Sequence, residues 1–310
     1  MFGAVEGDAA IDLVTHDIGE AIHGRDIIMV VIPAVYQSSI AQKMAPFLTD
    51  GQIIVLNPGA TGGALEVRNT IRKAGCGARV IVGETDTLLY ACRSIEPGVV
   101  QVYGVKDRVN VATLPAAESA RVAKLLNAAL PQFQPVDSVL ITSLNNPNAI
   151  VHPTPTLLNA GRIESRSAFD YYSDGVTPSI AKVVEKADQE RLAVAKALGV
   201  VVPTIQEWYY ECYGAEGKSL YEIIQNVNAY KGIKGPVTLD TRYLFEDIAT
   251  GLVPLSSLGR AVGVSTPTMD AVIELSNSLL GRNFWEEGRS LENLGLEGLN
   301  PEQIRELVLA

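Results

Sequence analysis

Residues 51–63 read GQIIVLNPGATGG, an unbroken apolar run that stops at a glycine-rich turn. Two similar apolar runs flank it, RDIIMVVIPA (25–34) and ARVIVGE (78–84). The stretches between these runs, SSIAQKMAPFL (38–48) and ALEVRNTIRKAG (64–75), have the apolar spacing of amphipathic helices. Unbroken runs rich in Val and Ile that alternate with helices are typical of a parallel sheet covered on both faces. This part of the chain therefore predicts an α/β domain.

The remainder of the first half carries weaker signals. VVQVYGVKDRVNVATLP (99–115) alternates with a period of two, which favours antiparallel strands at the margin of the sheet. SARVAKLLNAALPQF (119–133) has helical spacing and leads into the strand-like VDSVLIT (136–142). We therefore expect the α/β pattern to continue to about residue 145.

The second half carries helical signals alone. In TPSIAKVVEKADQERLAVAKALGV (177–200), Thr177 is a suitable cap, Pro178 occupies the first helical position and Gly199 stops the helix. Further helical stretches follow, and no strand-rich segment returns before the end of the sequence. The pattern predicts an all-α domain after the α/β domain.

The composition excludes several classes of protein. The chain has 310 residues, enough for two domains at roughly 150 residues each. Its net charge of −10 argues against binding to nucleic acid or to an anionic membrane, since both require clustered Lys and Arg. The three cysteines form no CxxC pair, so we expect neither a disulfide framework nor a structural metal site. No apolar run reaches the roughly 18 residues of a membrane helix, and we expect a soluble, cytoplasmic protein.

A sheet of this kind binds its ligands beyond the carboxyl ends of its strands. A dinucleotide site of this type has the motif G-x-G-x-x-G in the first strand–helix turn, where the glycines let the backbone approach the pyrophosphate. The motif is absent here, because GATGGA (59–64) has a different spacing and follows a later strand. We expect the sequence to begin after the segment that would contain it.

Several stretches together carry a family resemblance. They are VVIPA, LNPGATGGALE, VGETDTLLYACRS, SLNNPNAIVHPTPTLLNAGR, TPSIAKVVEKADQER and TRYLFEDIATGLVPLSSLGRAVGVSTP. With them the chain resembles the octopine/opine dehydrogenase family, and within it the bacterial N-(1-carboxyethyl)-L-norvaline dehydrogenase type. The resemblance implies a Rossmann-type dinucleotide-binding domain, truncated at its N-terminus, followed by an all-helical substrate domain. We place the first at residues 1–147, lacking its first strand–helix–strand unit of roughly fifty residues, and the second at 148–310.

The resemblance also implies a reaction. Opine dehydrogenases condense a 2-oxo acid, here pyruvate-like, with the amino group of an L-amino acid, reduce the resulting imine with NADH or NADPH, and catalyse the reverse oxidation. We expect NAD or NADP as the cofactor, with NAD favoured, and a homodimer. Two alternatives remain: another two-domain 2-oxo-acid or 2-hydroxy-acid dehydrogenase, which would be expected to rely on a lysine, or, if the sequence is complete as given, a non-catalytic binding or oligomerising remnant.

His152 is the candidate acid/base residue. A histidine at the start of an apolar helix is more often structural than catalytic, so its position alone does not decide the role. The family's catalytic histidine precedes P-x-P-T-L-L, and His152 precedes PTPTLL. The orienting carboxylate of the family follows a Phe-Glu pair and corresponds to Asp247, which would otherwise be an exposed acid on a helix.

The resemblance also assigns substrate contacts. Arg242, five positions before Asp247, corresponds to the residue that binds the carboxylate of the oxo acid, although a solvent-exposed arginine is the alternative. Thr85 resembles a second contact with the oxo acid, and Glu84 is expected to meet the amino group of the amino acid. We expect Cys92, in the same loop, to line the site.

Two turns are expected to meet the nicotinamide half of the cofactor, because each ends a strand of the sheet. A plain turn is the alternative for NPGATGG. The residues in these turns are Val31, Pro33 and Ala34 after the first strand, and Asn57, Pro58, Gly59 and Ala60 after the second.

Overall fold

The computed structural model describes residues 1–310. The chain forms two compact units, Met1–Ser143 with Val308–Ala310, and Leu144–Leu307. The first contains all the strands and the second is helical, so the expected α/β domain followed by an all-α domain is confirmed.

A five-stranded sheet in the order β2-β3-β4-β7-β8 forms the centre of the first unit. Strands β2, β3 and β4 are parallel, and they are level at their carboxyl ends, where Val30 pairs with Leu56 and Leu56 with Glu84. Strand β7 runs antiparallel to β4 and parallel to β8. The strands are β2 (Ile27–Val30), β3 (Ile53–Leu56), β4 (Ile81–Thr85), β7 (Val109–Leu114) and β8 (Phe133–Pro135).

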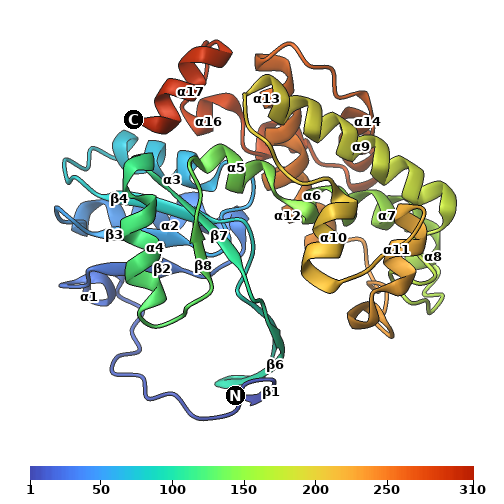
Figure 1. Cartoon of the computed structure of the whole chain (residues 1–310), viewed down its shortest axis with the longest axis horizontal. Helices are drawn as coiled ribbons and strands as arrows, with labels where there is room; N and C mark the ends of the chain where they lie inside the picture. Colours follow the sequence, from blue (N-terminus) through green and yellow to red (C-terminus); the bar gives the residue numbers. More distant parts are fainter. The chain divides into compact units, whose positions relative to one another are not determined.

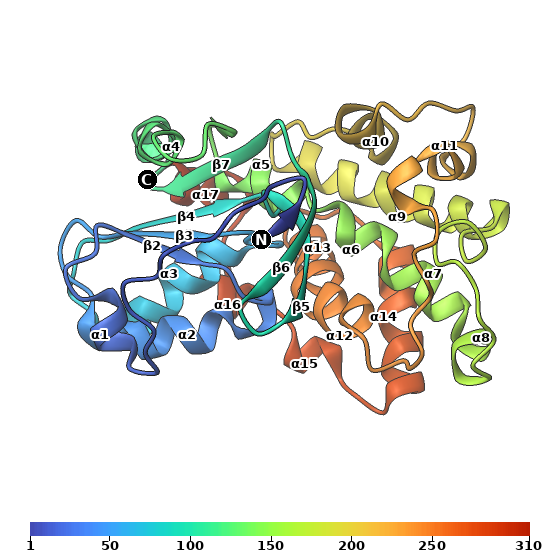
Figure 2. The ribbon, with the colours of Figure 1, turned by 90° about the horizontal axis from the view of Figure 1, so that it is seen from below.

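Helices cover both faces of this sheet, as Figures 1 and 2 show, with α2 and α3 on one face and α4 on the other. The four apolar residues of β3 are all buried because of this cover, whereas the edge strand β2 is only partly buried. One core cluster joins the sheet to α4; it contains Ile53, Val55, Leu89, Val109, Val111, Val122, Ala123, Leu126 and Phe133. The helices of this unit are α1 (Ile18–Ile22), α2 (Gln37–Met44), α3 (Gly63–Lys73), α4 (Ser119–Asn127) and α5 (Val139–Leu144), with short 3-10 turns at Ala34–Tyr36, Ala45–Phe47 and Ala116–Glu118.

A separate three-stranded sheet corrects one sequence prediction. Strands β1 (Phe2–Gly3), β6 (Val99–Val105) and β5 (Tyr90–Glu96) pair in the order β1-β6-β5, and β5 and β6 extend away from the main sheet in Figure 1. The alternating stretch 99–115 therefore divides between two sheets, and β7 lies inside the main sheet, not at its margin. Alternation predicts strands but does not specify their partners.

The strand expected over 136–142 is a second correction, since α5 occupies most of that stretch. Ser138 starts this helix: its hydroxyl accepts a hydrogen bond from the amide of Leu140 at 3.1 Å, and its carbonyl accepts one from Ile141 at 3.0 Å. Such a cap satisfies amides that the first helical turn leaves free, which here outweighs the strand preference of Val and Ile.

The helical unit is built around the 20-residue helix α9 (Pro178–Ala197). Its predicted start is confirmed, because the Thr177 hydroxyl accepts from the amide of Ile180, and Gly199 follows its end with a positive φ of 76°. The other helices are α6 (Pro147–Val151), α7 (Pro153–Leu158), α8 (Ala160–Glu164), α10 (Ile205–Tyr213), α11 (Leu220–Asn226), α12 (Arg242–Asp247), α13 (Val253–Ala261), α14 (Pro267–Leu280), α15 (Phe284–Glu287), α16 (Leu291–Leu294) and α17 (Pro301–Leu309), with a 3-10 turn at Asn228–Tyr230 and a π-helical turn, η5, at Ile248–Leu252.

A buried ion pair holds α9 to its neighbours. Arg191 and Asp188 are both almost fully buried, and Arg191 Nη2 lies 2.7 Å from Asp188 Oδ1. Arg191 also donates to the carbonyls of Leu144 and Pro203, and Asp188 accepts from the amide of Ile205 at the start of α10. The pair therefore fixes α9 to the first residue of the helical unit and to α10.

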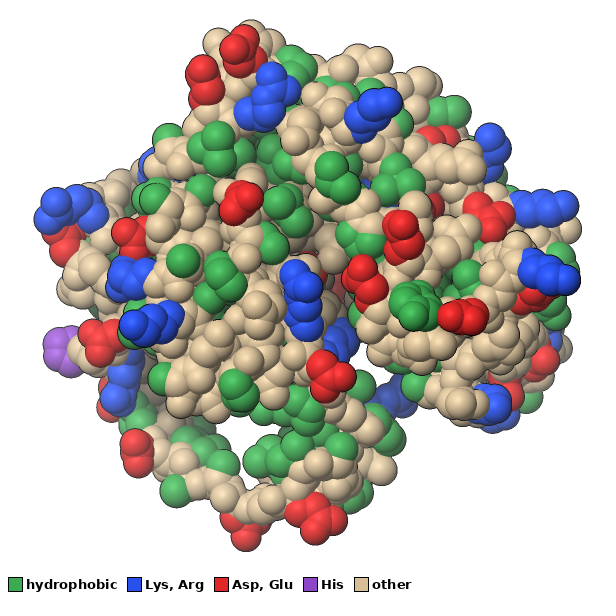
Figure 3. Space-filling view, in the orientation of Figure 1, with side chains coloured by type: hydrophobic (Ala, Val, Ile, Leu, Met, Phe, Trp, Pro, Cys, Tyr) green, Lys and Arg blue, Asp and Glu red, His purple; other side chains and the backbone are tan.

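The surface is of mixed charge. On the face that Figure 3 shows, acidic and basic side chains are interspersed. None of the helices combines the length and the hydropathy that crossing a membrane requires.

Candidate active site

In the helical unit, the structure brings His152 and Asp247 together. His152 lies between α6 and α7, Asp247 ends α12, and Nδ1 of the histidine is 2.8 Å from Oδ2 of the aspartate. Both side chains are mostly buried, with 14% and 15% of their surface exposed. Because a carboxylate only accepts hydrogen bonds, Nδ1 carries the proton of this bond and Nε2 is the nitrogen free to exchange one.

Three further contacts fix the position of His152. Its carbonyl accepts hydrogen bonds from the hydroxyls of Tyr171 and Thr156, both at 2.8 Å. The imidazole stacks on the ring of Tyr243, with centroids 4.3 Å apart and the planes inclined by 30°. The histidine is therefore held both at its backbone and at its ring.

Tyr172 contacts the second ring nitrogen. Its hydroxyl oxygen lies 3.1 Å from Nε2 of His152, and its ring stacks on Tyr230 at 3.7 Å, nearly parallel. Tyr172 was not among the site residues predicted from the sequence. The signal available was a pair of adjacent tyrosines, in the stretch FDYY (169–172), in a chain with 6% aromatic residues.

Burial changes the pKa values of three acidic groups around His152, those of Asp247, Tyr171 and Tyr172. It raises the pKa of the Asp247 carboxyl, an effect that the charge and hydrogen bond of His152 oppose. Burial also raises the pKa values of the Tyr171 and Tyr172 hydroxyls well above their ordinary value. Both tyrosines are therefore neutral at physiological pH, because desolvation disfavours the phenolate.

Arg242 begins the helix that Asp247 ends. Its Nε donates to Oε2 of Glu246, which is one helical turn along, and this is the ion pair that the arginine forms. The Arg242 side chain is 64% exposed, whereas Glu246 is buried. The bond at Nε leaves the two terminal nitrogens of the guanidinium to bind a carboxylate.

In the α/β unit, the structure gives Glu84 a different place from the one expected. Its carboxylate is fully buried and accepts hydrogen bonds from the hydroxyls of Thr142 and Ser143, at 2.7 and 2.6 Å, and from the amide of Ala64 at 2.7 Å. Ala64 is in the first turn of α3, where an acidic group satisfies a free amide and complements the helix dipole. The geometry favours a structural role for Glu84 over a contact with the amino group of a substrate.

Thr85 and Cys92 also differ from the expected picture. Thr85 is fully buried, and its hydroxyl lies 2.9 Å from the carbonyl of Thr87 and 3.1 Å from Oδ1 of Asn57. Cys92 is exposed and belongs to β5 of the separate sheet, so it does not share a loop with Thr85. The short apolar run LLYAC (88–92) was placed in a loop, whereas β5 of this second sheet begins within it.

The turns expected to meet the cofactor lie at one edge of the sheet, since β2 and β3 are adjacent and parallel. Val31 is 55% exposed, and Ala34 is buried. Asn57 and Gly59 are buried, and the backbone amide of Gly59 donates a hydrogen bond to the carbonyl of Thr85 at 3.0 Å. Pro33 precedes the 3-10 turn Ala34–Tyr36, and Pro58 and Ala60 complete the turn after β3.

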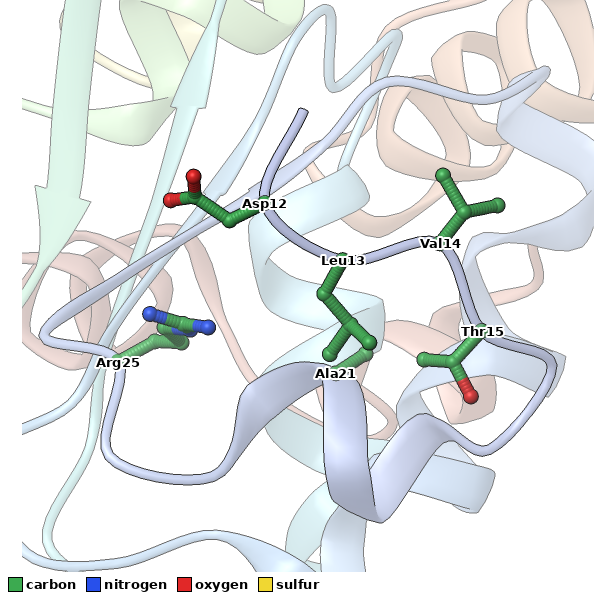
Figure 4. Close-up of a pocket in the computed structure, with 6 residues that line it drawn as sticks. All are labelled: Asp12, Leu13, Val14, Thr15, Ala21 and Arg25. Carbon is green, nitrogen blue, oxygen red and sulfur yellow. The ribbon is translucent and has the colours of Figure 1, made fainter. Parts of the chain in front are cut away.

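One pocket of the α/β unit lies apart from these residues. It has a volume of about 410 Å³ and is lined by Asp12, Leu13, Val14, Thr15, Ala21 and Arg25 (Figure 4). None of the candidate residues lines it. No group of His, Cys, Asp and Glu side chains with the arrangement of a metal site is present.

The sequence of this chain is similar to those of known proteins. Residues 135–280 match the family model described as NAD/NADP octopine/nopaline dehydrogenase, alpha-helical domain. An opine dehydrogenase of Arthrobacter sp. (strain 1C) is 50% identical over 302 residues, which are 97% of this chain and 84% of that protein.

Solved structures share the fold. Octopine dehydrogenase with NADH and L-arginine superposes with a TM-score of 0.79, at 23% identity over 97% of this chain and 82% of that one. Yersinopine dehydrogenase with NADP+ superposes with a TM-score of 0.70, at 16% identity over 96% and 81% of the two chains.

Proposed function

The chain belongs to the opine dehydrogenase family of NAD(P)-dependent oxidoreductases, and from this premise we propose how its own residues serve the reaction. The reaction is the reductive condensation of a 2-oxo acid with the amino group of an amino acid, and its reverse. For this chain we propose a pyruvate-like oxo acid and an L-amino acid. The observation that carries the proposal is the 2.8 Å pairing of His152 with Asp247, two residues 95 positions apart.

His152 would serve as the general acid/base. Nδ1 of His152 donates a hydrogen bond to Asp247, so the neutral imidazole can take up at Nε2 a proton that comes from the incoming ammonium group. Asp247 then stabilises the imidazolium that forms, and holds the ring in one tautomer. Addition of the amino group to the oxo acid gives a carbinolamine. The proton held by His152 is then available to the oxygen that leaves as water.

Arg242 would bind the carboxylate of the oxo acid. Its terminal nitrogens are oriented as a planar fork, which matches a carboxylate in a bidentate manner. Because Glu84 and Thr85 are fully buried and make their hydrogen bonds inside the α/β unit, we assign the carboxylate to Arg242 and not to those residues.

The turns after β2 and β3 fit a nicotinamide cofactor. The exposed side chain of Val31 offers an apolar surface at the carboxyl edge of the sheet, beside the turn that contains Asn57 and Pro58. These residues would hold the cofactor's nicotinamide half, which supplies the hydride when bound. The family uses NAD or NADP, and NAD is our choice for this chain. A homodimer and a cytoplasmic location stay predictions, which the molar mass in solution and cell fractionation would test.

An activity measurement tests the function. We expect the protein to oxidise NADH or NADPH when pyruvate and a suitable L-amino acid are both present, and the absorbance of the reduced cofactor follows the reaction. His152→Ala should lower kcat by about 10²–10⁴-fold while the cofactor still binds. Asp247→Asn should lower kcat more than it raises KM, because the carboxylate acts once the histidine is charged.

Two controls make the result specific. Omission of either substrate should abolish the oxidation, and His23→Ala, at an exposed histidine of the α/β unit, should leave the rate unchanged. Normal turnover by His152→Ala would refute the acid/base assignment.

A further inference from the structure

The nitrogen of His152 that exchanges protons already has a neighbour. Nδ1 is bound to Asp247, so Nε2 is the atom that transfers a proton, and the Tyr172 hydroxyl lies 3.1 Å from it. A hydroxyl has one proton and two lone pairs. It therefore donates to Nε2 when the imidazole is neutral and accepts from Nε2 when the imidazole is charged.

The Tyr172 side chain is held rigidly in this place. The side chain is 5% exposed, and its ring stacks on that of Tyr230. Its ring also makes an edge-to-face contact with that of Tyr171, with the centroids 4.9 Å apart. A ring packed in this way keeps its hydroxyl at one position without loss of further side-chain entropy.

His152 is the hydrogen-bond partner of the Tyr172 hydroxyl, and the bond uses only part of its capacity. In either protonation state of the histidine, the hydroxyl retains a lone pair or a proton for one more partner. Direct access to Nε2 from this side is closed by the same hydroxyl.

We propose that Tyr172 relays protons between Nε2 of His152 and the substrate, an inference that rests on the proposed function. When the ammonium group of the amino acid is deprotonated, its proton passes to the Tyr172 oxygen as the Tyr172 proton passes to Nε2. When the carbinolamine loses water, the leaving oxygen takes the Tyr172 proton, the C–O bond breaks, the nitrogen lone pair forms the C=N bond, and the imidazolium restores the proton to Tyr172.

The two proton movements occur together. Burial and the neighbouring tyrosines raise the pKa of the Tyr172 hydroxyl, so the phenolate is not a stable stage. The tyrosine is neutral before and after each step, and the histidine alone carries the stored charge.

Removal of one oxygen atom tests the relay. Tyr172→Phe keeps the ring and its stacking on Tyr230, and we expect kcat to fall by about 10²-fold, the lower part of the range for acid/base groups. Titration of NADH fluorescence should give unchanged binding. The solvent isotope effect is the second readout: a mixed H₂O/D₂O series should show two protons in flight in the wild-type protein and one in Tyr172→Phe.

Tyr230→Phe is the matched control. It removes a hydroxyl that lies 3.4 Å from that of Tyr209, in the same aromatic cluster, and leaves the bond between Tyr172 and His152 in place. We expect its rate and its isotope effect to equal those of the wild-type protein.

A ring-fluorinated tyrosine at position 172 gives an independent measurement if the phenylalanine variant does not fold. It keeps the hydroxyl and nearly the shape of the ring but is more acidic, so a relay makes the rate depend on the degree of fluorination. A rate that is insensitive to fluorination would contradict the relay.

The outcomes separate the two hypotheses. If the wild-type protein has no activity, the proposed function fails and the relay fails with it. If the wild-type protein turns over and Tyr172→Phe has the same rate and isotope effect, only the relay is wrong. A faster Tyr172→Phe would show that the hydroxyl blocks Nε2, which also overturns the relay.

Discussion

At the scale of single residues, Gly59 fits against Glu84 because it has no side chain. A Cβ atom at this position would lie 2.5 Å from Oε2 and 2.6 Å from Cβ of Glu84. The carboxylate cannot withdraw easily, since Thr142 and Ser143 bind it. The glycine of the turn after β3 is thus explained by the buried acid of the neighbouring strand.

Gly59→Ala should therefore destabilise the protein by about 1–3 kcal/mol, the usual cost of overpacking a filled site. Urea unfolding measures this change. Gly77→Ala is the control, because a Cβ there meets nothing within 4 Å, and it should leave the unfolding midpoint unchanged. Equal midpoints for the two variants would mean that the turn yields to the added methyl group.

The same residues show what a sequence leaves open. Glu84 follows an apolar run, and its position at the carboxyl end of a strand is compatible with binding a ligand or with capping α3. The choice depends on Thr142 and Ser143, nearly sixty positions away. For His152 the residue type and the matching stretch were informative, whereas the contact with Tyr172 comes from the tertiary fold.

At the scale of elements, the π-helical turn η5 stands directly after Asp247 and joins α12 to α13. π-helical turns are rare in proteins, but those that do occur are often found at functional sites. Gly251 in this turn lies against α6, where an added Cβ would be 2.5 Å from Cβ of Ala149. Because His152 directly follows α6, this close approach bears on the distance between the histidine and the aspartate.

Gly251→Ala should push η5 away from α6, and we expect kcat to fall by at least about tenfold, consistent with the sensitivity of catalysis to small displacements. Steady-state kinetics gives the change. Ala149→Gly removes the opposing methyl group, so the double variant should regain part of the rate. Independent, multiplicative effects of the two substitutions would argue against a direct contact.

Periodicity located most elements but not their partners. The three apolar runs became β2, β3 and β4, and the capped helix at 178–197 starts where Thr177 and Pro178 predicted it. The stretch 136–142 was misassigned because Val and Ile favour strands locally, while Ser138 and the bonds to Glu84 favour a helix. Local propensity is a weak guide where tertiary hydrogen bonds decide.

At the scale of the whole molecule, the pattern of apolar runs and amphipathic stretches was sufficient to predict the order of the two domains, an α/β domain followed by a helical one. The separate sheet of β1, β5 and β6 was not foreseen, because its pairing joins the first residues of the chain to residues about 100 positions later. Pairings of that range leave no local periodic signal.

The pair of Arg191 and Asp188 should matter to the stability of the helical unit as a whole. Arg191→Met leaves a carboxylate buried without its charge partner, and we expect a loss of about 3–5 kcal/mol of unfolding free energy. Chemical denaturation measures it. Arg79→Met, which breaks an exposed pair with Asp50, serves as the control and should not shift the midpoint. A small effect of Arg191→Met would mean that water enters to solvate Asp188.

The aromatic cluster beside His152 has one more consequence. The chain contains two tryptophans, and Trp208 is 9% exposed with its ring 5.2 Å from that of Tyr209, which in turn contacts Tyr230. The emission of Trp208 therefore reports on the packing of this cluster. The protein thus carries its own optical probe in the aromatic packing that extends to Tyr172, and no attached dye is needed to follow changes in that packing.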